Sequence, residues 1–225
     1  MRTPRRASLS CGAALLAGAA LLGAHSAAAV STAGDEIDKA LRAVPDLNRG
    51  AELFATCAAC HGADGAGAVD GSVPSIAGQH VAVILAQLVD FRQDRRIDIR
   101  MQHMVAADHL ATAQQLADVA AYATSLPLPP ARAGRAAAAQ LAEGSSSYAQ
   151  LCQSCHRAAA EGNAAERVPR LAGQHVEYLI RQLYDALEGR RPSMGRDHAR
   201  TLARLEPAQI ASLAAYLASL DPHPR

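Results

Sequence analysis

Two short segments carry the same set of reactive side chains. The first is Cys-Ala-Ala-Cys-His at residues 57–61, and the second is Cys-Gln-Ser-Cys-His at residues 152–156, 95 positions later. Two cysteines at this spacing can form a disulfide, supply half of a zinc site, act as a redox dithiol or anchor a haem. Other features of the chain distinguish these four chemistries.

The pattern agrees poorly with three of the four. A zinc site needs four ligands, whereas each segment offers one cysteine pair and one adjacent histidine. A thioredoxin-like dithiol normally accompanies a βαβ pattern, which is absent here. A short disulfide gives the histidines no role. Cys-x-x-Cys-His is the attachment signature of c-type haem, in which the cysteines form thioethers and the histidine binds iron.

The sequence therefore predicts two covalently attached haem c groups. The predicted thioether residues are Cys57, Cys60, Cys152 and Cys155, and the predicted proximal iron ligands are His61 and His156. Composition favours the same conclusion, because the 225 residues include two phenylalanines, five tyrosines and no tryptophan. Aromatic side chains normally fill much of a core. A large apolar cofactor would occupy that space.

The N-terminus predicts export. Residues 1–6 carry three arginines, residues 7–24 are small and apolar, and small residues at Ala27 and Ala29 resemble a signal-peptidase site. We expect residues 1–29 to be a signal peptide that directs the protein to the periplasm. Its removal takes away Cys11 and changes the net charge from +1 to about −2. Neither charge suggests a nucleic-acid partner.

An internal repeat predicts a duplicated domain. Val-Pro-Ser-Ile-Ala-Gly-Gln-His at 73–80 recurs as Val-Pro-Arg-Leu-Ala-Gly-Gln-His at 168–175, and Ala-Ala-Tyr at 120–122 recurs at 214–216 with the offset reduced to 94. We predict domains at residues 30–126 and 145–225, joined by a linker at 127–144 that contains three prolines. Apolar residues recur at helical spacing. The predicted fold is all-α, with three to four helices around each haem.

The sixth iron ligand has several candidates in each half. Methionine often fills this position in electron carriers. The first half offers Met101 and Met104, with His103 and His109 as weaker options, and the second offers Met194 and His198. We favour Met101 and Met194, because both halves then have the same chemistry. The register that places Met104 and His198 each 18 residues before a repeated tyrosine stays open as the alternative.

Several repeated residues are expected to support the haems. Pro74 and Pro169 each follow a proximal histidine by 13 residues, so the carbonyl at or before the proline could accept a hydrogen bond from that histidine's Nδ1. Two arginine pairs, 95–96 and 190–191, could bind propionates or form a solvated face. The Gln-His pairs at 79–80 and 174–175 are expected to be helix caps and interface residues.

These motifs resemble one known family. The Cys-x-x-Cys-His segments, the repeated Ala-Gly-Gln and the terminal Ala-Ala-Tyr helices, over residues 48–221, are similar to the tandem class I domains of dihaem cytochromes c4. The resemblance implies a soluble or loosely membrane-associated periplasmic carrier with two His/Met haems. In that family's spacing, the axial methionine position falls on Met104 in the first half and on His198 in the second.

The predicted function is one-electron transport between redox proteins. The expected donor is a quinol-oxidising cytochrome complex or a dehydrogenase, and the expected acceptor is a terminal oxidase or a reductase. No catalytic residue is predicted, since the protein only needs to hold the iron and set its potential. Two alternatives stay open: a cytochrome subunit of a redox enzyme complex, and a dihaem peroxidase or sulfur-compound oxidoreductase with an open haem.

Overall fold

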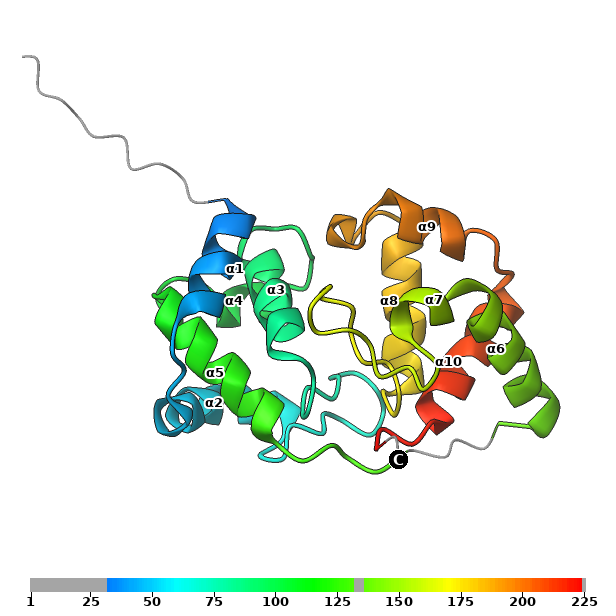
Figure 1. Cartoon of the computed structure of the whole chain (residues 1–225), viewed down its shortest axis with the longest axis horizontal. Helices are drawn as coiled ribbons and strands as arrows, with labels where there is room; N and C mark the ends of the chain where they lie inside the picture. Colours follow the sequence, from blue (N-terminus) through cyan, green and yellow to red (C-terminus); the bar gives the residue numbers. More distant parts are fainter. Residues whose placement is uncertain (1–31, 132–135, 224–225) are drawn as a thin grey trace, which may run out of the picture. The chain divides into compact units, whose positions relative to one another are not determined.

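The regular elements of the protein are helices. The computed structural model describes residues 32–131 and 136–223, and the predicted signal peptide at 1–29 lies outside them. Within those two ranges no strand forms; one isolated bridge joins Asn163 to Val168 (Figure 1). No helix in this part of the chain is long and apolar enough to cross a membrane. The all-α prediction is confirmed.

The first half contains five α-helices. They are α1 (Ala33–Arg42), α2 (Leu47–His61), α3 (Val81–Arg92), α4 (Ile99–Met104) and α5 (Ala113–Ser125). Four of them begin at a side chain whose oxygen accepts hydrogen bonds from the first-turn backbone: Thr32, Asp46, Asp98 and Thr112. Pro127 follows the last helix closely, which explains why α5 goes no further.

The second half repeats this arrangement with changes. Its helices are α6 (Ala138–Leu151), α7 (Gln153–His156), α8 (Val176–Leu187), the 3₁₀ helix η1 (Pro192–Met194), α9 (Arg196–Leu202) and α10 (Pro207–Ser219). Each half therefore has five α-helices among the described residues, rather than three to four, because short helices such as α4 and α7 give weak periodic signals. Helix α6 also covers the last part of the predicted linker at 127–144.

Each half is built on one close helix crossing. Helix α2 packs on α5, and α6 packs on α10. A glycine lies at each crossing: a Cβ added to Gly50 would come 2.3 Å from the backbone oxygen of Asp118, and one added to Gly144 would come 2.1 Å from that of Ser212. Only a residue without a side chain lets the two backbones approach this closely.

The two halves differ where the helix reaches the cysteine motif. Helix α2 continues without a break to His61, but α6 ends at Leu151, and Cys152 leaves helical geometry with φ −122° and ψ −34°. Gly50 precedes Cys57 by seven residues, whereas Gly144 precedes Cys152 by eight. The additional residue in the second half cannot fit one continuous helix that keeps both the crossing and the motif in place.

Helix α1 gives the first half a larger core. It packs on α3 and α5, and the Arg92 guanidinium of α3 forms an ion pair with Glu36 of α1. Ile37 and two alanines of α1 are buried. In the described part of the second half, no helix precedes α6 to take this place. Helix α1 was not predicted, because its apolar face is narrow and half of its residues are charged.

Candidate functional site: two Cys-x-x-Cys-His centres

The first centre lies on the last turn of α2. Cys57 and Cys60 are three residues apart on the helix and His61 is four residues after Cys57, so the three side chains share one face. The His61 side chain is buried, with 6% exposure, whereas Cys57 is half-buried and Cys60 is exposed. One helix face therefore carries two thiols and one buried imidazole.

The second centre has the same chemistry on the one-turn helix α7. His156 is 8% exposed, Cys152 is half-buried and Cys155 is exposed. The short helix restores the spacing of the motif after the break at Cys152. Both centres therefore present their groups in the same order, although they are built on different lengths of helix.

Burial keeps one thiol of each pair protonated. All four described cysteines are free. Burial raises the pKa of the Cys57 thiol and raises that of Cys152 to about 11, so these sulfurs are protonated at neutral pH. Thiolate is the form that attacks disulfides and binds zinc. Residues 32–131 and 136–223 contain no group of three or more His, Cys, Asp and Glu side chains that could hold a metal ion.

Each proximal histidine is fixed by a proline carbonyl. The Nδ1 atom of His61 lies 3.0 Å from the Pro74 oxygen, and the Nδ1 atom of His156 lies 3.0 Å from the Pro169 oxygen. Because a carbonyl only accepts, Nδ1 must carry the proton and Nε2 keeps a free lone pair. The predicted hydrogen bond is confirmed, and its acceptor is the proline itself. Each imidazole is thus prepared to bind iron through Nε2.

The loop that orients His61 is held by a glutamine of the other half. Ser75 directly follows Pro74, and both of its backbone groups bond to the Gln174 side chain: its N–H donates to Oε1 at 3.0 Å, and its oxygen accepts from Nε2 at 2.8 Å. Gln174 of the second half therefore positions Ser75, which lies next to the carbonyl that orients His61.

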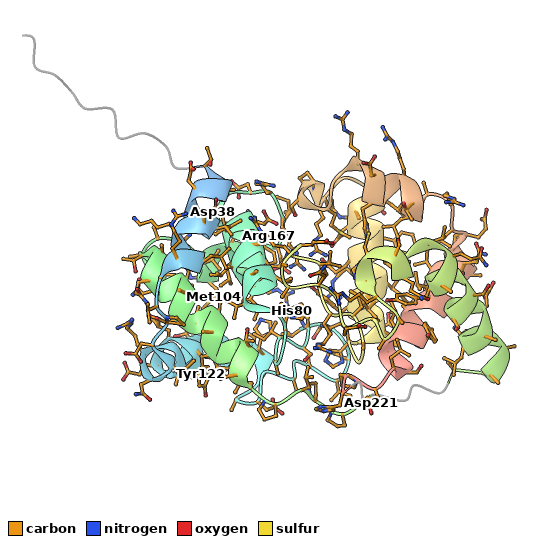
Figure 2. All side chains as sticks on the ribbon, viewed as in Figure 1. Asp38, His80, Met104, Tyr122, Arg167 and Asp221 are labelled. Atoms are coloured by element: carbon orange, nitrogen blue, oxygen red, sulfur yellow. The ribbon has the colours of Figure 1, made fainter. Side chains whose placement is uncertain are left out.

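The reverse contact has the same form. Arg170 follows Pro169; its N–H donates to the Gln79 Oε1 at 3.0 Å, and its oxygen accepts from the Gln79 Nε2 at 2.9 Å. His80, which Figure 2 labels, also bonds to the second half, since its Nε2 lies 2.8 Å from the Glu161 oxygen. Gln79 and His80 are interface residues, as predicted. His80 occupies the N-cap of α3 but makes no side-chain cap bond.

These crossed bonds predict a crossed mutational effect. Gln174→Ala should disturb the first centre more than the second, and Gln79→Ala should do the opposite, because each removes two hydrogen bonds worth about 1 kcal/mol each from the other half's proline loop. Proton NMR of the oxidised holoprotein would report the hyperfine-shifted signals of each proximal histidine. The two variants serve as each other's control, and an effect confined to the mutated half would contradict the prediction.

The arginine pairs divide into two kinds. Arg96 and Arg191 are enclosed: Arg96 donates to Gln87, Tyr178 and Gln182, and Arg191 donates to Gln182 and Gln87. Burial lowers the pKa of Arg191 to about 10, and no group in the described part of the chain bonds to its buried Nε. These two are not part of a solvated face.

The other arginine of each pair stays near the surface. Arg95 pairs with Asp90 at 3.4 Å, and Arg190 pairs with Asp185 at 2.8 Å. The roles of Gln87 and Gln182 were not predicted. A signal existed, because each glutamine precedes its enclosed arginine by nine residues in both copies of the repeat.

The sixth-ligand candidates occupy unlike environments. Met101 packs against the apolar core of the first half, and Met104 ends α4 half-buried. His103 and His109 are exposed and contact each other edge to face, with ring centroids 4.9 Å apart. The side chains of His103 and His109 therefore pack on each other at the surface.

In the second half, both candidates lie on the segment between α8 and α10. Met194 is half-buried at the end of η1. His198 lies on α9 with its ring 6.4 Å from that of His156, centroid to centroid. His198 is thus the candidate that faces a proximal histidine. Together, the free thiol pair and the oriented imidazole of each half fit a haem, and in the second half the His198 ring also faces that imidazole.

Comparison with known proteins supports this description. The cytochrome c family model matches residues 47–127 and 141–221. Cytochrome c4 of Pseudomonas aeruginosa is 31% identical over 189 residues, which cover 79% of this chain and 90% of that protein. The crystal structure of reduced cytochrome c4 from Pseudomonas stutzeri superimposes with a TM-score of 0.70 at 30% identity, covering 79% of this chain and all of that one.

A relative named for a different role is similar to almost the same extent. A thiosulfate dehydrogenase electron acceptor of Stutzerimonas stutzeri is 32% identical and covers 73% of this chain and 78% of its own length. The fold and the two centres define a tandem c-type cytochrome, that is, an electron-transfer protein with two covalently attached haem c groups. The chain belongs to the dihaem cytochrome c4 family.

Proposed function

We propose that this protein is a periplasmic one-electron carrier between respiratory redox proteins. The observation that carries the proposal is the duplicated buried histidine, oriented by a proline carbonyl beside two free thiols. A donor such as a quinol-oxidising complex or a dehydrogenase would reduce it, and a terminal oxidase or reductase would oxidise it. The predicted signal peptide at 1–29 supports the location.

The proposed anchoring follows the motif. Cys57 and Cys60 would hold the first haem and Cys152 and Cys155 the second, each through thioethers formed with the porphyrin. His61 and His156 would bind iron through Nε2, because their Nδ1 atoms are already hydrogen-bonded. When bound, each haem supplies the one-electron redox chemistry.

The protein itself has three tasks: to hold the imidazoles, to exclude water and to place a sixth ligand. A firmly held sixth ligand keeps the iron geometry nearly constant between oxidation states, which favours fast electron transfer. The first haem would receive it from α4, through Met101 or Met104, and the second from Met194 or His198. No acid, base or nucleophile of the chain is required.

The proposal is tested on holoprotein purified from the periplasmic fraction. We expect two haems per chain, low-spin spectra, and reduction followed by reoxidation when membranes that contain a quinol-oxidising complex and an oxidase are added. Open, high-spin haem with peroxide or thiosulfate turnover would instead identify an oxidoreductase.

A second role, as the cytochrome subunit of a redox enzyme complex, is favoured by the relative named thiosulfate dehydrogenase electron acceptor. Affinity purification under mild conditions separates the two roles. A diffusible carrier elutes without partners, whereas a subunit elutes with a dehydrogenase in a fixed ratio.

A further inference from the structure

His198 is placed as a ligand rather than as a surface histidine. It lies in the first turn of α9, half-buried, and its ring faces that of His156 at a centroid distance of 6.4 Å with 70° between the planes. Its Nδ1 is buried and finds no hydrogen-bond partner among the described residues. A buried imidazole nitrogen normally finds a partner.

The separation of the two rings fits one iron between them. A metal–imidazole nitrogen bond is about 2 Å long, so two imidazoles on opposite sides of one metal have centroids about 6 Å apart. The observed 6.4 Å is close to this value. Two histidines packed directly on each other lie closer, as the surface pair His103 and His109 shows at 4.9 Å.

The internal repeat identifies the equivalent ligand in the first half. The offset is 95 at the arginine pairs, but counted back from the terminal helices, where Tyr122 corresponds to Tyr216, it is 94. The same offset relates Met104 to His198.

The offset of 94 does not pair the other two candidates, Met101 and Met194, with each other. By the same offset, Met101 corresponds to Gly195, and Met194 corresponds to Arg100. Met194 also belongs to η1, where the neighbouring Ser193 N–H donates to the Arg95 oxygen of the first half at 3.4 Å. The segment that carries Met194 therefore has a contact of its own with the first half.

We propose that His198 is the sixth ligand of the second haem and that Met104 is the sixth ligand of the first. The inference rests on the proposed function and replaces the matched pair, Met101 and Met194, that the sequence favoured. It makes the two haems unlike: the first has His61 and Met104, and the second has His156 and His198.

Unlike ligands give the two halves unlike potentials. Thioether ligation raises the potential of a haem, so the bis-histidine haem of the second half is the more reducing. With both haems bound, one electron received by the second half would pass downhill to the first, so that the second haem would be reoxidised as the first is reduced. The second half is the entry side, and the first half delivers the electron to the acceptor.

The test uses the full-length holoprotein and four variants. EPR and near-infrared magnetic circular dichroism of the oxidised protein should show one bis-imidazole haem and one His/Met haem. His198→Ala should remove the first signature, Met104→Ala should remove the second, and Met194→Ala, the matched control, should leave both. His198→Met should give two His/Met signatures and raise the lower of the two midpoint potentials.

The opposite results are equally specific. Two His/Met haems in the unmodified protein, or loss of a signature in Met194→Ala, would overturn the assignment, as would an open haem. Haem content is measured before the spectra. Fewer than two haems per chain contradicts the proposed function itself, whereas two haems without a bis-imidazole signature overturn this inference alone.

Discussion

Gly50→Ala is expected to lower the free energy of unfolding by about 3 kcal/mol or more. The added Cβ would lie 2.3 Å from the Asp118 backbone oxygen and 2.9 Å from the Tyr122 Cβ, and backbone cannot move aside as a flexible side chain can. Helices α2 and α5 would have to separate along their crossing. Because α2 continues into the first cysteine motif, the separation would also displace His61 from the Pro74 carbonyl.

The control for this substitution lies in α1. Gly34→Ala adds the same atom to a helix, but the nearest group, the Thr32 Oγ1, is 3.8 Å away. Alanine is the better helix former, so Gly34→Ala should leave the free energy of unfolding unchanged or raise it by up to about 1 kcal/mol. Guanidinium unfolding of the holoproteins, followed by far-UV circular dichroism, measures both.

The corresponding change in the second half is Gly144→Ala. Its Cβ would lie 2.1 Å from the Ser212 oxygen, so it should be at least as damaging as Gly50→Ala. Equal stability of the Gly34 and Gly50 variants would show that the crossings tolerate a side chain and that our account of them is wrong.

The features that sequence predicts well are those encoded by local spacing. Residues 57–61 and 152–156 specify the chemistry, and the repeat specifies two similar all-α halves, because both depend only on positions along the chain. The bond from His61 to Pro74 belongs to this group, since a loop of 13 residues that starts and ends at one centre leaves few acceptors within reach.

The features that sequence could not predict depend on contacts between distant segments. Gln79 and Gln174 are visible as a repeat, but nothing local shows that each holds the other half's proline loop. A single additional residue before Cys152 breaks a helix only because Gly144 is fixed at the crossing. The sixth ligand is the same kind of problem: chemical symmetry favoured Met194, whereas the facing ring favours His198.

A large loss of structure is expected when one haem is removed. The double variant Cys57→Ala/Cys60→Ala should carry haem only in the second half, and Cys152→Ala/Cys155→Ala only in the first. A haem is part of the core in such small domains, which bury little surface by themselves. Each variant should therefore lose structure in its own half, and pyridine haemochrome spectra should give one haem per chain.

The second half should lose more structure without its haem than the first half does. Among the described residues, the apolar cluster of the first half contains fourteen buried side chains, including Phe54 and Phe91, and is extended by α1. The cluster of the second half contains seven, of which Tyr148 is the only aromatic one. At roughly 25 cal/mol per Å² of buried apolar surface, the smaller cluster contributes much less stability without its haem.

Hydrogen exchange detected by mass spectrometry resolves the two halves in each variant. We expect α2, α3 and α5 to keep partial protection when the first haem is absent, because α1 and its ion pair to α3 remain. Helices α6, α8 and α10 should exchange almost fully when the second haem is absent. Equal protection of the two haem-free halves would mean that α1 adds little, and that the crossings at Gly50 and Gly144, rather than the apolar clusters, determine what survives without haem.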